Sequence, residues 1–121
     1  MKLKLRVRTK RLKLTPVMTK AEFNSSVLKS DSTKVVVFVA SWCGYCRRFF
    51  DIASSPEIEG ELNAVDVDDE DESLWDEFRI PLVPTIFVFQ NGKEIFRQNG
   101  RPGIGLVKGD LERALAAASA R

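Results

Sequence analysis

The two cysteines of the chain, Cys43 and Cys46, are separated by two residues and are its only thiols. They follow the apolar run 34–40, typical of a buried strand, and precede a segment over 47–53 with a helical pattern. Cys43 is therefore expected at a helix N-terminus, where unpaired backbone N–H groups and the helix dipole favour the thiolate that attacks disulfides. Cys46 lies one turn further on and can close a ring with Cys43. This spacing indicates a dithiol–disulfide switch.

Other uses of a cysteine pair fit this sequence less well. A structural zinc site normally takes four Cys or His ligands, whereas the chain has two Cys and no His. A zinc site, or an iron–sulfur cluster, would therefore have to be shared between two chains. A purely structural disulfide would close a loop of only two residues, which gives little loop-entropy stabilisation. We therefore expect redox exchange and no metal.

The hydrophobic pattern predicts regular elements on both sides of the cysteine turn. Thr19 and Glu22 form a capping-box pattern before a helix over 20–29, and Asn91-Gly92 is a two-residue hairpin signal. Leucines alternate with Lys and Arg over 3–14, which predicts an exposed edge strand. The other predicted elements are strands at 34–40, 61–68, 85–89 and 93–98, a helix from the cysteine turn to about 54, and helices at 71–79 and 106–118. A parallel unit thus precedes an antiparallel hairpin and a covering helix.

Several motifs in this order resemble the thioredoxin family. They are Val39-Ala40-Ser41-Trp42-Cys43-Gly44-Tyr45-Cys46, Val65-Asp66-Val67-Asp68, Val83-Pro84-Thr85 and Phe89-Gln90-Asn91-Gly92. A Cys-x-x-Cys near a βαβ pattern is itself a general sign of a thioredoxin-like redox site. The resemblance covers roughly residues 12–118 and implies a thioredoxin-like α/β fold, a central mixed sheet with helices on both faces.

The resemblance also implies roles for the site residues. Cys43 would be the exposed, attacking sulfur and Cys46 the resolving thiol. Val83–Pro84 would be a cis peptide beside the cysteines, with the Val83 backbone free to pair with an extended substrate. The substrate surface would comprise Trp42, Gly44, Tyr45, Val83, Pro84 and Thr85. The substrates would be protein disulfides, with no bound cofactor, and electrons would come from a thioredoxin-reductase-like donor or a small thiol.

Two features depart from the family pattern. Typical members carry a buried Asp six residues before the first cysteine and a Lys on the adjacent strand, where this chain has Val37 and Ala64. That pair is thought to manage the proton of the second thiol, so proton transfer here needs water or another group. Tyr45 replaces the Pro typical between the cysteines, and this dipeptide strongly influences the redox potential. Arg47 and Arg48 are candidates for electrostatic support of the thiolate.

Length and charge limit the remaining possibilities. The 121 residues are expected to form one domain over 1–121, in which 1–11 is a basic N-terminal extension or edge strand. Residues 1–14 hold seven Lys or Arg and no acid, yet the whole chain has a net charge of only +2, so nucleic-acid binding is not expected. No segment is long enough to span a bilayer, and the N-terminus lacks the continuous apolar region of a signal peptide. A cytoplasmic monomer that does not bind membranes is therefore expected.

Two alternatives to a disulfide reductant stay open. The protein could act as a disulfide oxidase or isomerase, because the Gly-Tyr dipeptide leaves the direction of transfer undetermined. It could also be a redox-linked binding protein that presents the Trp42, Tyr45 and Pro84 surface to one partner. The absent Asp–Lys pair and the basic N-terminal strand motivate this second alternative.

Overall fold

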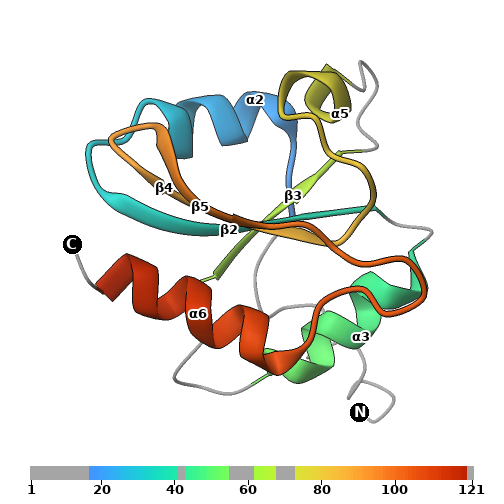
Figure 1. The fold of residues 1–121 in the computed structure, drawn as a ribbon. Helices are drawn as coiled ribbons and strands as arrows, with labels where there is room; N and C mark the ends of the chain where they lie inside the picture. Colours follow the sequence, from blue (N-terminus) through green and yellow to red (C-terminus); the bar gives the residue numbers. More distant parts are fainter. Residues whose placement is uncertain (1–16, 41–42, 55–61, 68–72, 120–121) are drawn as a thin grey trace, which may run out of the picture.

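A computed structural model describes residues 17–40, 43–54, 62–67 and 73–119 of the chain (Figure 1). Its centre is one sheet of five strands in the order β1-β3-β2-β4-β5. The strands are β1 (Val17–Met18), β2 (Thr33–Val39), β3 (Leu62–Asp66), β4 (Thr85–Gln90) and β5 (Lys93–Gln98). β3 pairs in parallel with both β1 and β2, while β4 runs antiparallel to both β2 and β5. The predicted mixed sheet is therefore confirmed.

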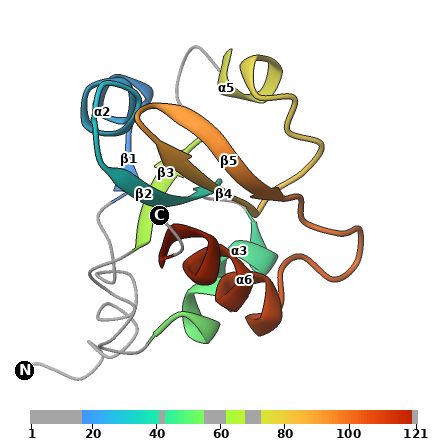
Figure 2. The ribbon, with the colours of Figure 1, turned by 60° about the vertical axis from the view of Figure 1, so that its left-hand side comes forward.

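Helices cover both faces of the sheet. On one face lie α2 (Lys20–Phe23), the π-helical turn η1 (Asn24–Leu28) and α5 (Ser73–Glu77), and on the other lie α3 (Gly44–Ile52) and α6 (Lys108–Ser119). The two views agree on this arrangement (Figures 1 and 2). The α/β fold class expected from the sequence is thus confirmed, and α3, which follows the first cysteine, packs beside α6.

Aromatic rings fill the space between the sheet and the α2–α5 side. Phe23 of α2 meets Phe38 and Phe89 edge-on at centroid distances of 5.4 and 5.5 Å. Phe78 meets Phe87 and Phe89 at 5.8 Å in each case. Such edge-to-face pairs add stability beyond the apolar area that they bury. The ring cluster fixes how β2 and β4 lie against the helices, and those strands carry the segments of the site.

The capping box predicted at Thr19 is present, but the helix after it is shorter than predicted. The backbone N–H of Thr19 donates to Glu22 Oε1 at 2.9 Å, and the N–H of Glu22 donates to Thr19 Oγ1 at 3.2 Å. After Phe23 the helix changes to the π-helical turn, in which Lys29 N–H donates to Asn24 O. The Ser25 hydroxyl donates to Glu22 O at 3.3 Å. This side-chain bond competes for a backbone acceptor and favours the departure from regular α geometry.

The hairpin between β4 and β5 turns where the sequence predicts it. Asn91 and Gly92 have φ angles of 53° and 77°, as a two-residue turn with two left-handed residues requires. The register shifts between Val88 and Phe89 on β4, which accounts for the irregular alternation of apolar residues along β5.

The structure does not test the predicted N-terminal strand. The alternating segment 3–14 lies outside the described residues, as does the predicted extension 1–11. The first strand that the structure describes is β1, which pairs Val17 with Ala64 and Met18 with Val65. Two residues are too few to show a periodic pattern, so the sequence did not indicate this strand.

Candidate active site

Cys43 lies where β2 gives way to α3 and acts as the N-cap of that helix. Its backbone is extended, and its sulfur accepts a hydrogen bond from the Cys46 N–H at 3.1 Å. An N-cap acceptor bonds one of the donors that the first turn of a helix leaves free. The same N–H group and the helix dipole stabilise negative charge on the sulfur. The fold therefore provides the thiolate-favouring position predicted from the sequence.

The cysteine turn faces the loop before β4. The Val83–Pro84 peptide is cis, which confirms the expectation from the family resemblance. The thiol of Cys43 donates to Val83 O at 3.6 Å. Residues separated by forty positions in the sequence thus meet at the sulfur, and the carbonyl that precedes Pro84 lies next to the candidate nucleophile.

Both thiols are reduced and buried in this structure. Cys43 has 5% of its surface exposed and Cys46 has 2%, so the expectation of an exposed Cys43 is wrong for this conformation. The physical reason is that the sulfur turns inward to the Cys46 N–H and to the Val83 carbonyl. A substrate disulfide would need a local movement to reach it.

Burial affects the chemistry of Cys46 directly. Loss of hydration raises the pKa of the Cys46 thiol well above its ordinary value, and the neighbouring Cys43 sulfur raises it further. The Ala40 backbone and the positive charge of Arg47 act in the opposite direction and are outweighed. Cys46 is therefore a protonated thiol at neutral pH, and of the two predicted arginines Arg47 acts electrostatically on Cys46.

The two residues that depart from the family pattern are neighbours in the sheet. Val37 on β2 pairs in register with Ala64 on β3, and neither side chain is exposed. Val37 also pairs with Ile86 of β4. The positions that carry an Asp and a Lys in typical thioredoxins thus form continuous apolar core here, and they offer no group that could take a proton from Cys46.

The other residues predicted to bind substrate lie in different surroundings. Trp42 is outside the described residues, Gly44 is exposed, and Tyr45 is 40% exposed with the Arg48 guanidinium 5.6 Å from its ring centre. Thr85 is fully buried, and its hydroxyl donates to Leu82 O at 2.7 Å. Tyr45 therefore presents a surface to solvent, whereas Thr85 braces the cis-proline loop from inside.

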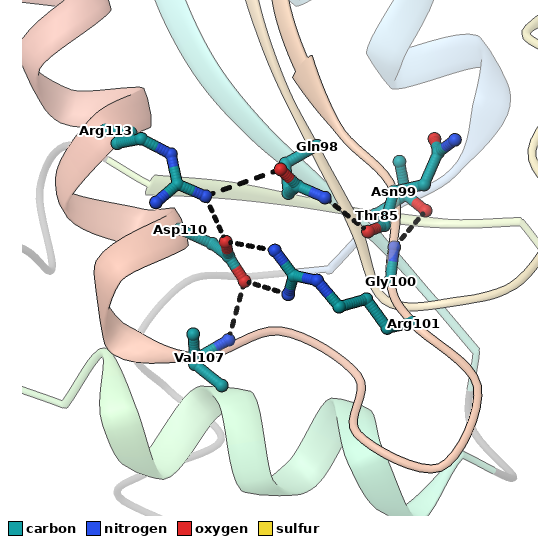
Figure 3. Close-up of polar contacts among 8 residues, drawn as sticks. All are labelled: Thr85, Gln98, Asn99, Gly100, Arg101, Val107, Asp110 and Arg113. Carbon is teal, nitrogen blue, oxygen red and sulfur yellow. Dashed lines mark hydrogen bonds and ion pairs between the residues drawn. The ribbon is translucent and has the colours of Figure 1, made fainter.

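A polar cluster near the site was not predicted from the sequence. Asp110 in the first turn of α6 is completely buried and accepts two hydrogen bonds from Arg101, at 2.9 and 3.0 Å. It also accepts from the Val107 N–H at 2.8 Å and pairs with Arg113 (Figure 3). The only sequence signal was an acid in the first turn of a helix, which does not reveal a partner nine residues away.

The described part of the chain, residues 17–40, 43–54, 62–67 and 73–119, contains neither a metal-binding cluster nor a membrane-spanning helix. Within it, no group of three or more His, Cys, Asp or Glu side chains is placed to hold a metal ion. No helix in the same residues is both long and apolar enough to cross a bilayer.

Comparison with known proteins places the chain in a family. The family model described as Thioredoxin matches residues 14–110. A thioredoxin of Rickettsia felis is 34% identical over 80 residues, which make up 64% of this chain and 76% of that protein. Thioredoxin X, chloroplastic, of Arabidopsis thaliana is 37% identical over 78 residues, or 62% of this chain and 43% of that one. A bifunctional thioredoxin reductase/thioredoxin of Mycobacterium leprae is 32% identical over 102 residues, 81% of this chain and 22% of the relative. Together with the helix-capping cysteine and the cis proline beside it, these matches show that the chain belongs to the thioredoxin family.

Proposed function

We propose that this thiol–disulfide oxidoreductase reduces protein disulfides, with Cys43 as the attacking sulfur and Cys46 as the resolving one. The observation that carries the proposal is the position of the Cys43 sulfur. It caps α3 at 3.1 Å from the Cys46 N–H and lies 3.6 Å from the carbonyl before the cis Pro84. The first contact favours a thiolate, and the second means that an extended substrate backbone paired with Val83 would lie next to the sulfur.

The exchange runs in two balanced steps. The Cys43 thiolate attacks one sulfur of the substrate, so that a mixed disulfide forms while the substrate S–S bond breaks, and the leaving sulfur departs as a thiolate. Cys46 then loses its proton and attacks the Cys43 sulfur. The Cys43–Cys46 disulfide forms, the mixed disulfide breaks, and two electrons have passed to the substrate.

The proton of Cys46 needs an acceptor, because its pKa is raised by burial. Val37 and Ala64 supply none. The departing substrate thiolate, formed beside the pair in the first step, is a base that the reaction itself supplies, and water is the other candidate. Transfer to either is uphill as long as burial keeps the pKa of Cys46 raised. We therefore infer that resolution is coupled to protonation of the substrate leaving group.

The protein is further proposed to work as a cytoplasmic monomer without a bound cofactor. An external reductase or a small thiol would return the disulfide to the dithiol state. A relative whose name joins a thioredoxin reductase to a thioredoxin supports a donor of the reductase type.

A trapping experiment tests the two cysteine roles. Cys46→Ser should accumulate a mixed disulfide with an oxidised protein such as insulin, because no thiol remains to resolve it, whereas the matched Cys43→Ser should accumulate little. Mass spectrometry under non-reducing conditions measures both. Equal trapping by the two variants would contradict the assigned order of attack.

The reduction potential tests the direction of transfer. Equilibration with defined dithiothreitol or glutathione ratios should give a reversible two-electron transition near about −270 mV for a reductant. A value near or above about −180 mV would favour a disulfide oxidase or isomerase. A chain with no reversible transition would instead be a redox-linked binding protein, a reading that the apolar Val37–Ala64 pair motivates.

A further inference from the structure

The loop from Gly100 to Val107, between β5 and α6, contacts both the cis-proline segment and the cysteine turn. At its start, the Gly100 N–H donates to Thr85 Oγ1 at 3.3 Å, and a Cβ placed on Gly100 would lie 2.3 Å from Pro84 O. Further along, a Cβ on Gly105 would lie 3.0 Å from the Cβ of Tyr45. The loop is therefore packed against the cis-proline segment at one point and against the residue between the cysteines at another.

The middle of this loop has a closed shape of its own. The Arg101 N–H donates to Gly105 O at 3.0 Å, and the Gly105 N–H donates back to Arg101 O at 2.8 Å. Gly103 and Gly105 have φ angles of 77° and 78°, which residues with side chains rarely adopt. These bonds close the turn on itself, so the contacts at its two ends orient it relative to the rest of the site.

One carboxylate holds both ends. Asp110 accepts two hydrogen bonds from the Arg101 guanidinium at the start of the turn and one from the Val107 N–H at its end (Figure 3). Its side chain is 0% exposed. A buried carboxylate that loses one partner becomes costly, so each contact reinforces the other. Arg113, one turn further along α6, also pairs with Asp110.

The turn carries apolar side chains that face solvent. Within the described residues, the large hydrophobic side chains that are exposed are Tyr45, Ile104 and Val107, at 40%, 46% and 43%. Ile104 directly precedes the glycine that contacts Tyr45, and Val107 is the residue whose N–H Asp110 binds. The exposed apolar residues thus belong to the cysteine turn and to the loop that Asp110 holds.

The geometry points to Asp110 as a positioning residue for exchange with protein disulfides. Through Arg101 and Val107 it holds the loop beside Tyr45, so that Ile104 and Val107 meet the apolar segment next to the substrate cysteine. This inference rests on the proposed function, because it concerns the substrate class of the same site. It concerns binding of a polypeptide and not the chemistry of the sulfurs, so a small disulfide should not depend on Asp110.

Asp110→Asn is the sharpest variant, because an amide keeps the shape and can still accept from Val107 while it loses the charge that pairs with Arg101. The KM for insulin, with dithiothreitol as the final reductant, should rise about three- to tenfold with kcat changed less than about twofold. The rate with 2,2′-dithiodipyridine, a small neutral disulfide, should not change. Arg101→Met should likewise raise the KM for insulin. Glu112→Gln, which removes an exposed acid from the same helix, should leave the KM and kcat for insulin and the rate with dithiodipyridine unchanged.

A structural readout accompanies the kinetics. The nuclear Overhauser effect between Gly105 and the Tyr45 ring should weaken in Asp110→Asn and stay as it is in Glu112→Gln. An unchanged insulin KM in Asp110→Asn would overturn the inference while leaving the proposed function intact. An equal loss of rate with insulin and with dithiodipyridine would also overturn it, since the role would then be general stability. A wild-type protein that reduces neither disulfide would overturn the proposed function and the inference together.

Discussion

The two cysteines have identical side chains, but the fold gives them different surroundings. Cys43 caps a helix and accepts a hydrogen bond from the Cys46 N–H, while the Cys46 thiol has a pKa raised chiefly by burial. The same N–H group that stabilises negative charge on the first sulfur comes from the residue that carries the second. At the residue scale, one turn of α3 thus combines a sulfur that accepts a helix N–H group with a buried thiol whose pKa is raised.

The raised pKa of Cys46 predicts how the stability of the reduced protein depends on alkaline pH. The unfolded chain releases this proton near a pKa of about 8.5, whereas the folded chain retains it. The free energy of unfolding should therefore fall as pH rises above that value, by at most about 1.4 kcal/mol per pH unit from this group. Urea unfolding of the reduced wild type and of Cys46→Ala from pH 7 to 10 measures it.

Comparison of the two proteins isolates the contribution of Cys46, because Lys and Tyr side chains titrate alike in both. The difference between their unfolding free energies should be constant below about pH 8 and should shift against the wild type above it. A difference that stays level up to pH 10 would mean that Cys46 ionises as readily in the folded protein as in the unfolded chain.

At the scale of elements, the register of β2 against β3 brings together the two positions that depart from the family pattern. Val37 and Ala64 are directly paired and completely buried, and strand alternation places both on one face of the sheet. A carboxylate at one position and an ammonium at the other would meet in a site without water. The apolar pair avoids the desolvation of two charges, and neither of its side chains can accept a proton.

This register predicts a strong coupling between substitutions at the two positions. Val37→Asp alone should lower the free energy of unfolding by about 3–5 kcal/mol, because it buries an unpaired charge. Adding Ala64→Lys should cost less than the two single changes combined, since the ammonium partners the carboxylate across the strands. Urea unfolding of the four proteins in the cycle gives the coupling energy.

Val37→Asn serves as the control, because it introduces polarity of similar size without a charge. Its combination with Ala64→Lys should show a much smaller coupling energy than the Asp–Lys pair. Equal coupling for Asn and Asp would mean that crowding, and not charge pairing, links the two positions.

At the scale of the whole molecule, the sequence predicted the features encoded by neighbouring residues. The cysteine spacing, the capping box of Thr19 and Glu22 and the Asn91-Gly92 turn each depend on a few consecutive positions, and all are present. The cis peptide before Pro84 followed from the family resemblance. Short local patterns are reliable because their partners are close along the chain.

Features that depend on tertiary packing were not predicted. The burial of Cys43 arises from a carbonyl forty residues away, and no spacing in the sequence indicates it. The link between Arg101 and Asp110 joins an irregular loop to a helix, where no periodicity relates the two positions. The change from α to π geometry after Phe23 is accompanied by a side-chain bond from Ser25 to Glu22 O, which no periodicity in the sequence indicates. Contacts of these kinds appear only when the elements are assembled.

The Arg101–Asp110 ion pair also makes the free energy of unfolding of the whole protein depend on pH in the acidic range. The Arg101 guanidinium holds the pKa of the Asp110 carboxyl below its ordinary value despite the opposing effect of burial. An acid whose pKa is lower in the folded state stabilises that state above its unfolded pKa of about 3.9, and this contribution is lost as pH falls through the folded value. The stability advantage of the wild type over Asp110→Asn should therefore be full at pH 6 and should shrink steadily below about pH 4.

A double-mutant cycle of Asp110 and Arg101, measured at acidic pH, identifies why the stability advantage of Asp110 over Asn is lost there. In the Arg101→Met background, the group that most lowers the pKa of Asp110 is absent. The difference in unfolding free energy between Asp110 and Asn should therefore be smaller at pH 6 and should vary less with pH. Circular dichroism during urea titration at pH 6, 4 and 3 measures the four proteins. If the advantage of Asp110 were the same at all three pH values in the wild-type background, the carboxylate would not be held in its charged form by Arg101. The loop beside the cysteines would then owe its position to the glycine turn and to hydrogen bonding alone.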